Sequence, residues 1–594
     1  MVWRPVTFRS ISRSGLLISC LAGCGGHSSS ATTPPPTLVT SEEHPGANDG
    51  VDLIITAAQI VTNDPEHPTA AALAIDGDTI IAVGTELELA PLAGRGTRRI
   101  ALDHLAVSPG LIDAHAHLYG LGLSLDGIDL RGAATEAAAI ASLKSGASRF
   151  GATEWITGRG WDQTRWPTTA WPTKESLDAA LPGRAIYLRR VDGHAAWCSS
   201  AALGAAHITR DTKDPAGGKI MRDAKGNPTG VLVDNALDLV EAALPVATAD
   251  VRERRIRVAA QLAVAAGITG VDEMGIESET ADVYARLAAA NQLPLHVYAF
   301  LDGTKKDVLD RLSTPPASPV GRFTLRGVKF FADGALGSRG ARLFTPYNDE
   351  PKSSGLWVTT PAVLAANIDL AVSHGWQVAV HAICDAAVAI VLDGCIAAQT
   401  KAGRADQRLR VEHAQIVRAS DFERFVSSRS IASMQPTHAT SDMRWAEQRI
   451  GKQRIVGAYA WRTMLDKSIR LAYGSDFPVE DVAPLLGIYA AVTRQDARGT
   501  PAAGWYPEQR LTFAEALAAF TSGAAYAQFE EATRGRIAAG FKADLTVYAL
   551  PLAGDNSLLT NTIVATLVDG EVVYDPGQHF ALLGKPGSPQ EARN

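Results

Sequence analysis

Apolar segments of strand length alternate with amphipathic segments of helix length through the middle of the chain. The eight candidate strands span residues 105–112, 268–272, 295–300, 327–331, 377–381, 409–413, 431–435 and 469–473. Such alternation predicts a parallel sheet covered by helices. Eight βα units over about 420 residues fit a TIM barrel with insertions, although alternation alone also allows a doubly wound open sheet. We therefore predict an α/β fold with a (β/α)8 barrel over residues 106–530.

A long segment, from residue 120 to about 250, separates the first two candidate strands. It contains five of the 11 tryptophans of the chain. An insertion that leaves the carboxyl end of a barrel strand lies over the mouth of the barrel, where substrates enter. We expect a cap that shapes a substrate pocket, with most of its tryptophans in the core of the cap itself.

Both flanks of this region carry short β-type runs separated by turn signals such as Asp76-Gly77-Asp78. Neither flank has enough strands for a stable sheet by itself. We expect residues 51–105 and 531–580 to form one small β-sandwich domain around the inserted barrel, followed by a tail at residues 581–594.

The first 50 residues differ from the rest of the chain. Three arginines precede a short apolar stretch at residues 15–23, which is typical of a secretory signal peptide. The stretch ends in the letters LAGC, which resemble the lipobox of bacterial lipoproteins, and the cysteine is Cys24. We expect residues 1–23 to be a lipoprotein signal peptide, Cys24 to carry lipid, and residues 24–50 to be a flexible tether.

Lipidation would place the protein in the bacterial cell envelope, on the periplasmic face of a membrane, with the outer membrane favoured. An ordinary signal peptide cut elsewhere, or a misassigned start codon, is the alternative. No apolar run of about 18 residues follows residue 30, so the only membrane contact that we expect is the lipid anchor.

The composition narrows the class of protein. With 594 residues, 46% hydrophobic and 20% charged, the chain can bury a large core and is not a disordered or fibrous protein. The net charge of −7 argues against nucleic acid as a partner. The five cysteines show neither a disulfide framework nor the spacing of a cysteine-based zinc site.

Polar side chains follow the candidate strands where these end. His115 and His117 lie two apart in an extended segment, so both imidazoles can reach one metal ion. Four more such side chains end other candidate strands or lie close to their ends: Lys329, His381, His413 and Asp476. Catalytic residues of a TIM barrel gather at these strand ends. Nitrogen and oxygen ligands without thiolate suit zinc or a similar divalent ion.

Eight motifs in consistent order resemble the amidohydrolase superfamily. They are PGLIDAHAH at 109–117, GWDQ at 160–163, DGHA at 192–195, VKFFADG at 328–334, HAI at 381–383, EHAQ at 412–415, GSD at 474–476 and GFKADL at 540–545. Within the superfamily the chain is similar to the amidohydrolase 3 group, which includes N-substituted formamide deformylases and YtcJ-like proteins.

The resemblance implies a role for each of the six polar residues. His115 and His117 would bind the more buried metal together with Asp476. Lys329 would be carbamylated to N6-carboxylysine and would bridge two metals, and the second metal would be bound by His381 and His413. If Lys329 is unmodified, a site with one metal is the alternative.

These roles imply hydrolysis of a C–N bond in an amide, a formamide or a cyclic amide of a small molecule, with Asp476 moving the proton of the attacking water. The same fold could instead act on an ester or lactone, or deaminate a nucleobase. A surface lipoprotein that only binds a ligand is the alternative from another class. The chain could also form a homodimer. Weaker candidates for substrate contacts are Asp162, His194, Asp333, Arg339 and His438.

Overall fold

The computed structural model describes residues 39–40, 50–403 and 406–581. The expected signal peptide, Cys24, nearly all of the expected tether and all but the first residue of the expected tail lie outside the described residues. Two residues of the expected tether form the short strand β1 (Val39–Thr40), which pairs with β4 (Thr79–Gly84). Within the described part of the chain, no helix is long and apolar enough to cross a bilayer.

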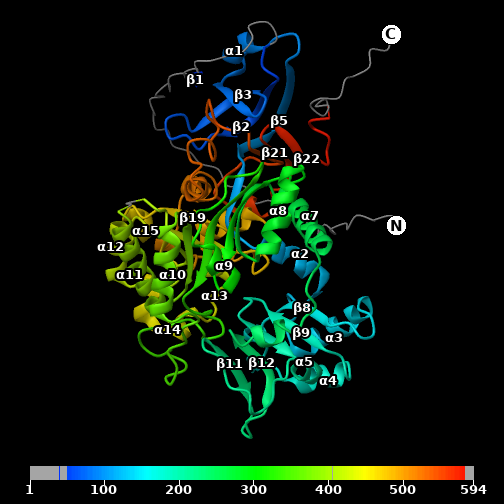
Figure 1. The fold of residues 1–594 in the computed structure, drawn as a ribbon. Coiled ribbons are helices and arrows are strands. Elements are labelled where there is room, and N and C mark those ends of the chain that lie inside the picture. Colours follow the sequence, from blue (N-terminus) through cyan, green and yellow to red (C-terminus); the bar gives the residue numbers. More distant parts are fainter. Residues whose placement is uncertain (1–38, 41–49, 404–405, 582–594) are drawn as a thin grey trace, which may run out of the picture. The chain divides into compact units, whose positions relative to one another are not determined.

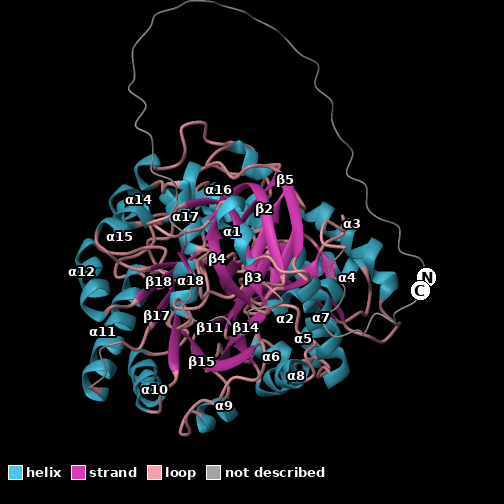
Figure 2. Cartoon of the chain, turned by 90° about the horizontal axis from the view of Figure 1, so that it is seen from above, coloured by secondary structure: helices cyan, strands magenta, loops and turns pink. Residues whose placement is uncertain are grey.

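Eight parallel strands form the central sheet, in the order in which the chain visits them. They are β6 (Leu111–Ala116), β13 (Ile268–Ile276), β14 (His296–Asp302), β15 (Phe323–Phe331), β16 (Gln377–Ala382), β17 (Arg410–His413), β18 (Ile431–Met434) and β19 (Leu471–Tyr473). Figure 2 shows helices around these strands. The predicted TIM barrel is therefore confirmed.

Helices connect the barrel strands. They include α7 (Ala249–Ala265), α8 (Ser278–Ala289), α9 (Lys306–Arg311), α10 (Pro361–Ser373), α11 (Asp385–Ala402), α12 (Ala419–Ser428), α13 (Pro436–Asp442), α14 (Ala446–Arg454), α15 (Trp461–Asp466), α16 (Pro484–Thr493), α17 (Phe513–Ala519) and α18 (Ser522–Ala527). Their apolar faces, apart from that of α18, are buried in one continuous core with the outer faces of the strands, and α18 packs in a smaller cluster with residues of β6, β18 and β19. This core holds the strand ends, and hence the polar side chains that follow them, in place.

The last strand meets the first through the loop that follows it. Asp476 N donates to His115 O at 2.7 Å, and His117 N donates to Phe477 O at 2.9 Å. A Cβ on Gly474 would lie 2.4 Å from His115 N, so only glycine allows this approach. The closure brings Asp476 beside His115 and His117, although more than 300 residues separate them in the sequence.

The predicted first barrel strand, 105–112, is wrong in its boundaries. The structure has two strands there, β5 (Arg98–Pro109) in the sheet of the terminal domain and β6 in the barrel. Gly110 separates them, and its Cβ would lie 2.3 Å from the Thr269 side chain. Because residues on both sides of Gly110 are buried, the apolar run is continuous and does not reveal the change of sheet. The sheet of the terminal domain consequently extends past residue 105.

Both ends of the described chain build one β-rich domain, as predicted, and Figure 1 shows its blue and red strands together. Hydrogen bonds join the strands in the order β1-β4-β3-β2-β5-β20-β21-β22. The remaining bounds are β2 (Leu53–Val61), β3 (Thr69–Asp76), β20 (Leu545–Tyr548), β21 (Ile563–Val568) and β22 (Glu571–Tyr574), with α1 (Glu86–Leu89) after β4. The two ends meet where β5 pairs with β20, and Val107, Leu545 and Ala565 share one core.

The segment between β6 and β13 forms a cap with its own sheet. It begins with α2 (Leu118–Asp126), and its strands are β7 (Ile128–Asp129), β8 (Ile156–Trp161), β9 (Ile186–Arg190), β10 (Ala195–Cys198), β11 (Gly218–Arg222) and β12 (Pro228–Asp234). Its other helices are α3 (Glu136–Gly146), α4 (Lys174–Ala180), α5 (Ser200–Ala205) and α6 (Asp238–Glu241). Trp161, Trp166 and Trp197 pack together in the core of the cap, whereas Trp155 lines a cavity.

Candidate metal centre

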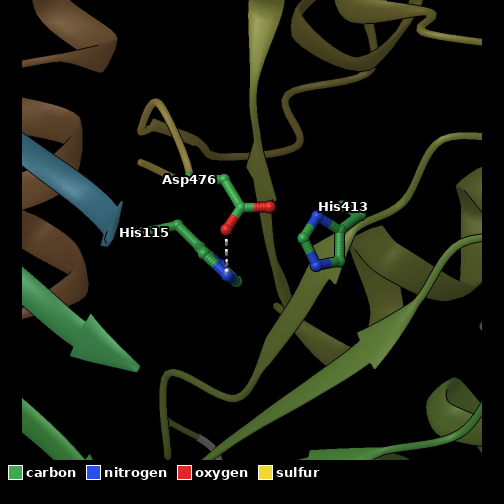
Figure 3. A group of neighbouring side chains, drawn as sticks. All are labelled: His115, His413 and Asp476. Carbon is green, nitrogen blue, oxygen red and sulfur yellow. Dashed lines mark ion pairs between the residues drawn. The ribbon is translucent and has the colours of Figure 1, made fainter. Parts of the chain in front are cut away.

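Six side chains meet at the carboxyl ends of the barrel strands: His115, His117, Lys329, His381, His413 and Asp476. The ring centroids of His115 and His413 lie 4.7 Å apart, and those of His381 and His413 lie 4.6 Å apart. One ligand atom each from His115, His413 and Asp476 falls within 4.8 Å of the others, close enough to bind one ion. Figure 3 shows these three side chains pointing toward one another.

The Asp476 carboxylate lies among imidazoles. Its Oδ1 is 3.2 Å from His117 Nε2 and 3.8 Å from His115 Nε2, and its Oδ2 is 3.5 Å from His438 Nε2. Burial raises the pKa of Asp476, but His115 and His117 outweigh this effect, so its pKa lies well below the usual value. Oδ1 is buried and has no hydrogen-bond donor among the described residues, which leaves it available to a ligand.

A carboxylate behind His115 sets the orientation of its ring. Glu412 Oε2 lies 2.5 Å from His115 Nδ1, so Nδ1 carries the proton and Nε2 presents its lone pair to the centre. Arg410 Nε in turn donates to Glu412 Oε1 at 2.7 Å. Burial and the charge of Lys329 lower the pKa of His115 to about 4, although Glu412 opposes them. His115 is therefore neutral near pH 7, the form that binds metals.

The other two buried imidazoles are oriented in the same way. His413 Nδ1 lies 2.8 Å from Gln435 Oε1, and His381 Nε2 lies 3.2 Å from the carbonyl oxygen of Gly334. Each acceptor holds one ring proton and leaves the opposite nitrogen of the ring unprotonated. Burial lowers the pKa of both imidazoles well below the usual value, so both are neutral.

Lys329 is fully buried among these groups, with an exposed fraction of 1%. Its Nζ lies 3.3 Å from His115 Nε2 and forms no ion pair with a carboxylate of the described residues. Burial lowers the pKa of Lys329 to about 8. A buried lysine without a carboxylate partner is costly, so its chemical state or its partner must differ from that of an ordinary lysine.

A cavity of about 1600 Å³ joins these residues to the cap. Its lining includes all six metal-centre residues, together with Trp155 and Tyr187 of the cap. The volume is enough for a small organic molecule, and the barrel and the cap both contribute to its wall.

The family model of the amidohydrolase family matches residues 98–574. The chain belongs to the amidohydrolase family. It is 34% identical to the putative amidohydrolase YtcJ of Bacillus subtilis, over 81% of this chain and 91% of that protein. It is 28% identical to the N-substituted formamide deformylase of Arthrobacter pascens, over 88% of this chain and 98% of that protein.

A solved structure has the same architecture. An uncharacterized metal-dependent hydrolase from Pyrococcus horikoshii matches with a TM-score of 0.68 and 27% identity, over 84% of this chain and 97% of that chain. Together with the family membership and the cluster of imidazoles and carboxylate, this match identifies the chain as a metal-dependent hydrolase.

Two of the predicted substrate contacts of this amidohydrolase lie beside the metal centre. The ring centroid of His194 is 4.9 Å from that of His381, and His194 Nδ1 is 2.8 Å from Asp234 Oδ1. His438 contacts Asp476, as described above, and both histidines line the cavity. Asp162 also lines the cavity, but its carboxylate is held by Arg190 at 2.6 Å.

Two other predicted contacts, Asp333 and Arg339, are not among the residues that line the cavity, and their contact with substrate stays a prediction. The Asp333 carboxylate accepts hydrogen bonds from the backbone of Ile383 and Cys384, at 2.9 and 3.1 Å, and so supports the loop after β16. Arg339 pairs with Asp349 at 2.8 Å. Both side chains therefore have polar partners within the protein.

The pair Arg410 and Glu412 is not among the residues predicted from the sequence, although it supports the metal centre. These residues lie two apart in β17, so their side chains share one face of the strand, away from His413. A signal for them was present, because two charged residues alternate with an apolar one inside a buried strand. Such charges require partners within the protein.

Proposed function

We propose that this amidohydrolase cleaves a C–N bond of an amide, N-formyl or cyclic amide substrate. The ligands of a divalent ion, with zinc favoured, would be His115, His117, Lys329, His381, His413 and Asp476. Support for the bond type comes from the family membership and from the N-substituted formamide deformylase among the relatives. The observation that carries the proposal is the buried Asp476 carboxylate, whose Oδ1 lies 3.2 Å from His117 Nε2 and accepts no hydrogen bond from the described residues.

The residues present fit a metal ion. Three neutral imidazoles each have one nitrogen held by a protein acceptor, which leaves the other nitrogen free. Nitrogen and oxygen donors without thiolate suit zinc. In the arrangement that we propose, His115, His117 and Asp476 would hold one ion and His381 and His413 a second, and Lys329 as its carbamate would supply anionic oxygens to both.

When bound, a divalent ion lowers the pKa of a water molecule toward about 7 and polarises the scissile carbonyl group. Asp476 accepts the proton of the attacking water and returns it to the leaving nitrogen. His438 Nε2 lies 3.5 Å from Asp476 Oδ2, on the cavity side of this carboxylate. The cap covers the substrate, because its residues line the same cavity.

Metal removal tests this proposal. We expect the purified protein to contain divalent metal, to hydrolyse members of a panel of N-formyl and N-acyl compounds, and to lose activity with a chelator. Added Zn²⁺ should restore turnover. Metal analysis measures the metal content, and release of amine measures the hydrolysis. Matched esters and nucleobases in the same panel would reveal another bond type, and a metal-free protein without turnover on any member would contradict the proposal.

Lys329 gives a separate prediction. The neutral amine would add to CO₂, forming an N–C bond and releasing one proton, and the resulting anionic carbamate would suit a site between cations. We expect NMR of protein equilibrated with isotope-labelled bicarbonate to show one carbamate signal, which is absent in Lys329→Met. Exposed Lys306, replaced by methionine, is the matched control and should keep the signal. A wild-type protein that binds metal but lacks the signal would favour an unmodified lysine.

A further inference from the structure

The cavity above the metal centre is lined by many basic side chains, and most of these have a carboxylate partner. Arg190 pairs with Asp162 and Asp192, and Arg189 pairs with Glu241 at 3.5 Å. Four arginines that line the cavity form no ion pair with a described residue: Arg159, Arg165, Arg444 and Arg498. Arg165, Arg444 and Arg498 are exposed, so water solvates their charges, whereas Arg159 is only partly accessible.

The guanidinium of Arg159 has unused donors. Nη2 donates to the carbonyl oxygen of Val191 at 2.9 Å, while Nε is buried and has no hydrogen-bond acceptor among the described residues. An arginine presents five N–H donors in a planar fork. An unpaired, partly desolvated cation of this kind is costly unless an anion joins it.

Arg159 lies close to the reacting centre. Its Nη2 is 3.3 Å from the position of a Cβ on Gly193, and the residue after Gly193 is His194, whose ring lies 4.9 Å from that of His381. Only one short loop of the cap therefore separates the guanidinium from the expected metal ligands.

A second arginine, Arg189, lies beside Arg159, and Glu241 pairs with it. Arg159 and Arg189 are paired residues on the neighbouring parallel strands β8 and β9, so their side chains lie on the same face of the cap sheet. Burial and the charge of Arg189 lower the pKa of Arg159 to about 10, although Asp476 and Asp192 oppose them. Arg159 stays charged near pH 7, and the potential around it attracts an anion.

We propose that Arg159 binds a carboxylate of the substrate, so that this enzyme prefers amides that carry a carboxylate near the scissile C–N bond. The inference rests on the proposed hydrolysis of an amide and names its substrate class. The planar fork of arginine matches the two oxygens of a carboxylate, which would replace the missing hydrogen-bond acceptors. Arg159 is a substrate-binding residue in this proposal and takes no part in the proton transfer.

Matched substrates test the assignment. N-formylphenylalanine carries a carboxylate, and N-formylphenylalanine amide is neutral and nearly isosteric. We expect wild type to prefer the acid, and Arg159→Gln to lower kcat/KM for the acid about 30-fold while turnover of the neutral amide stays close to wild type. Arg159→Lys keeps the charge but loses the planar fork, so its kcat/KM for the acid should lie between those of wild type and Arg159→Gln. Arg165 is an exposed arginine of the same cavity, and Arg165→Gln is the control. This variant should keep the wild-type kcat/KM for both substrates.

Unchanged turnover of the neutral amide would show that Arg159→Gln is folded. Equal loss on both substrates, or no preference for the acid in wild type, would overturn the proposal. A second pair of substrates tests which anion is preferred: N-formylaminoethyl phosphate carries a phosphate, and N-formyl-β-alanine carries a carboxylate. A higher kcat/KM for the phosphate would overturn the carboxylate assignment.

A binding measurement separates this inference from the proposed function. Calorimetric titration of N-formylphenylalanine into the chelator-treated full chain needs no turnover. We expect binding to weaken about 30-fold in Arg159→Gln. Binding that depends on Arg159 without hydrolysis by the metal-loaded enzyme would reject the amide hydrolysis and keep the carboxylate site. Hydrolysis with binding that is insensitive to Arg159 would reject the carboxylate site alone.

Discussion

Replacement of Asp476 by asparagine should lower kcat about a thousandfold, within the range that general acid–base catalysis supplies. The amide keeps the shape and one oxygen donor of the carboxylate but cannot accept a proton. The environment of Asp476 favours the charged form, because its pKa is held well below the usual value by His115 and His117 in spite of burial. Steady-state hydrolysis of the substrate found in the panel, at saturating Zn²⁺, measures the effect.

Asp481→Asn is a matched control for this experiment. Asp481 lines the same cavity, but it is exposed and accepts a hydrogen bond from Ala483 N at 3.1 Å. Its replacement should leave kcat close to the wild-type value. If Asp476→Asn retained both its metal and near wild-type turnover, another group would have to move the proton.

Replacement of Arg410 by methionine should lower the free energy of unfolding by about 4 kcal/mol, because two buried carboxylates lose their cation. The Arg410 side chain is fully buried and pairs with both Asp272 and Glu412. It also donates to Ser433 Oγ at 2.9 Å and to the carbonyl oxygen of Ala114. Methionine fills a similar length but satisfies none of these acceptors. Urea unfolding followed by circular dichroism measures the loss.

An exposed arginine provides the comparison. Arg286 Nη1 lies 2.6 Å from Glu253 Oε2, and 54% of its side chain is exposed. Arg286→Met should cost less than about 1 kcal/mol, as exposed ion pairs usually do. A similarly small loss for Arg410→Met would show that the buried network contributes little net stability and that its main effect is to orient His115 through Glu412.

Much of the barrel could be predicted from the sequence, because a buried parallel strand is a short apolar run that turn signals and helices separate from the next. The change of sheet at Gly110 could not be predicted in this way. Residues before and after it are buried, in different sheets, so hydrophobicity is the same on both sides. The six polar side chains of the metal centre were visible as exceptions to the apolar pattern at the strand ends.

The partners of the charged residues needed the tertiary structure. Arg159, Arg189 and Arg190 lie within two neighbouring strands of the cap and look equivalent in the sequence. The fold gives acidic partners to Arg189 and Arg190 but leaves Arg159 facing the cavity without one. It also holds Arg339 in an ion pair with Asp349, outside the cavity lining.

The βα order and the polar residues at the ends of the strands follow from the amino-acid sequence, because side-chain direction and strand length depend on local periodicity. Which of these residues meet, and which charges are left unpaired, depends on the fold of the whole chain. Asp476 reaches His115 and His117 through the closure of the barrel, which depends on the close approach at Gly474. Electrostatic pairing depends on distance in space, and the fold alone brings such distant segments together.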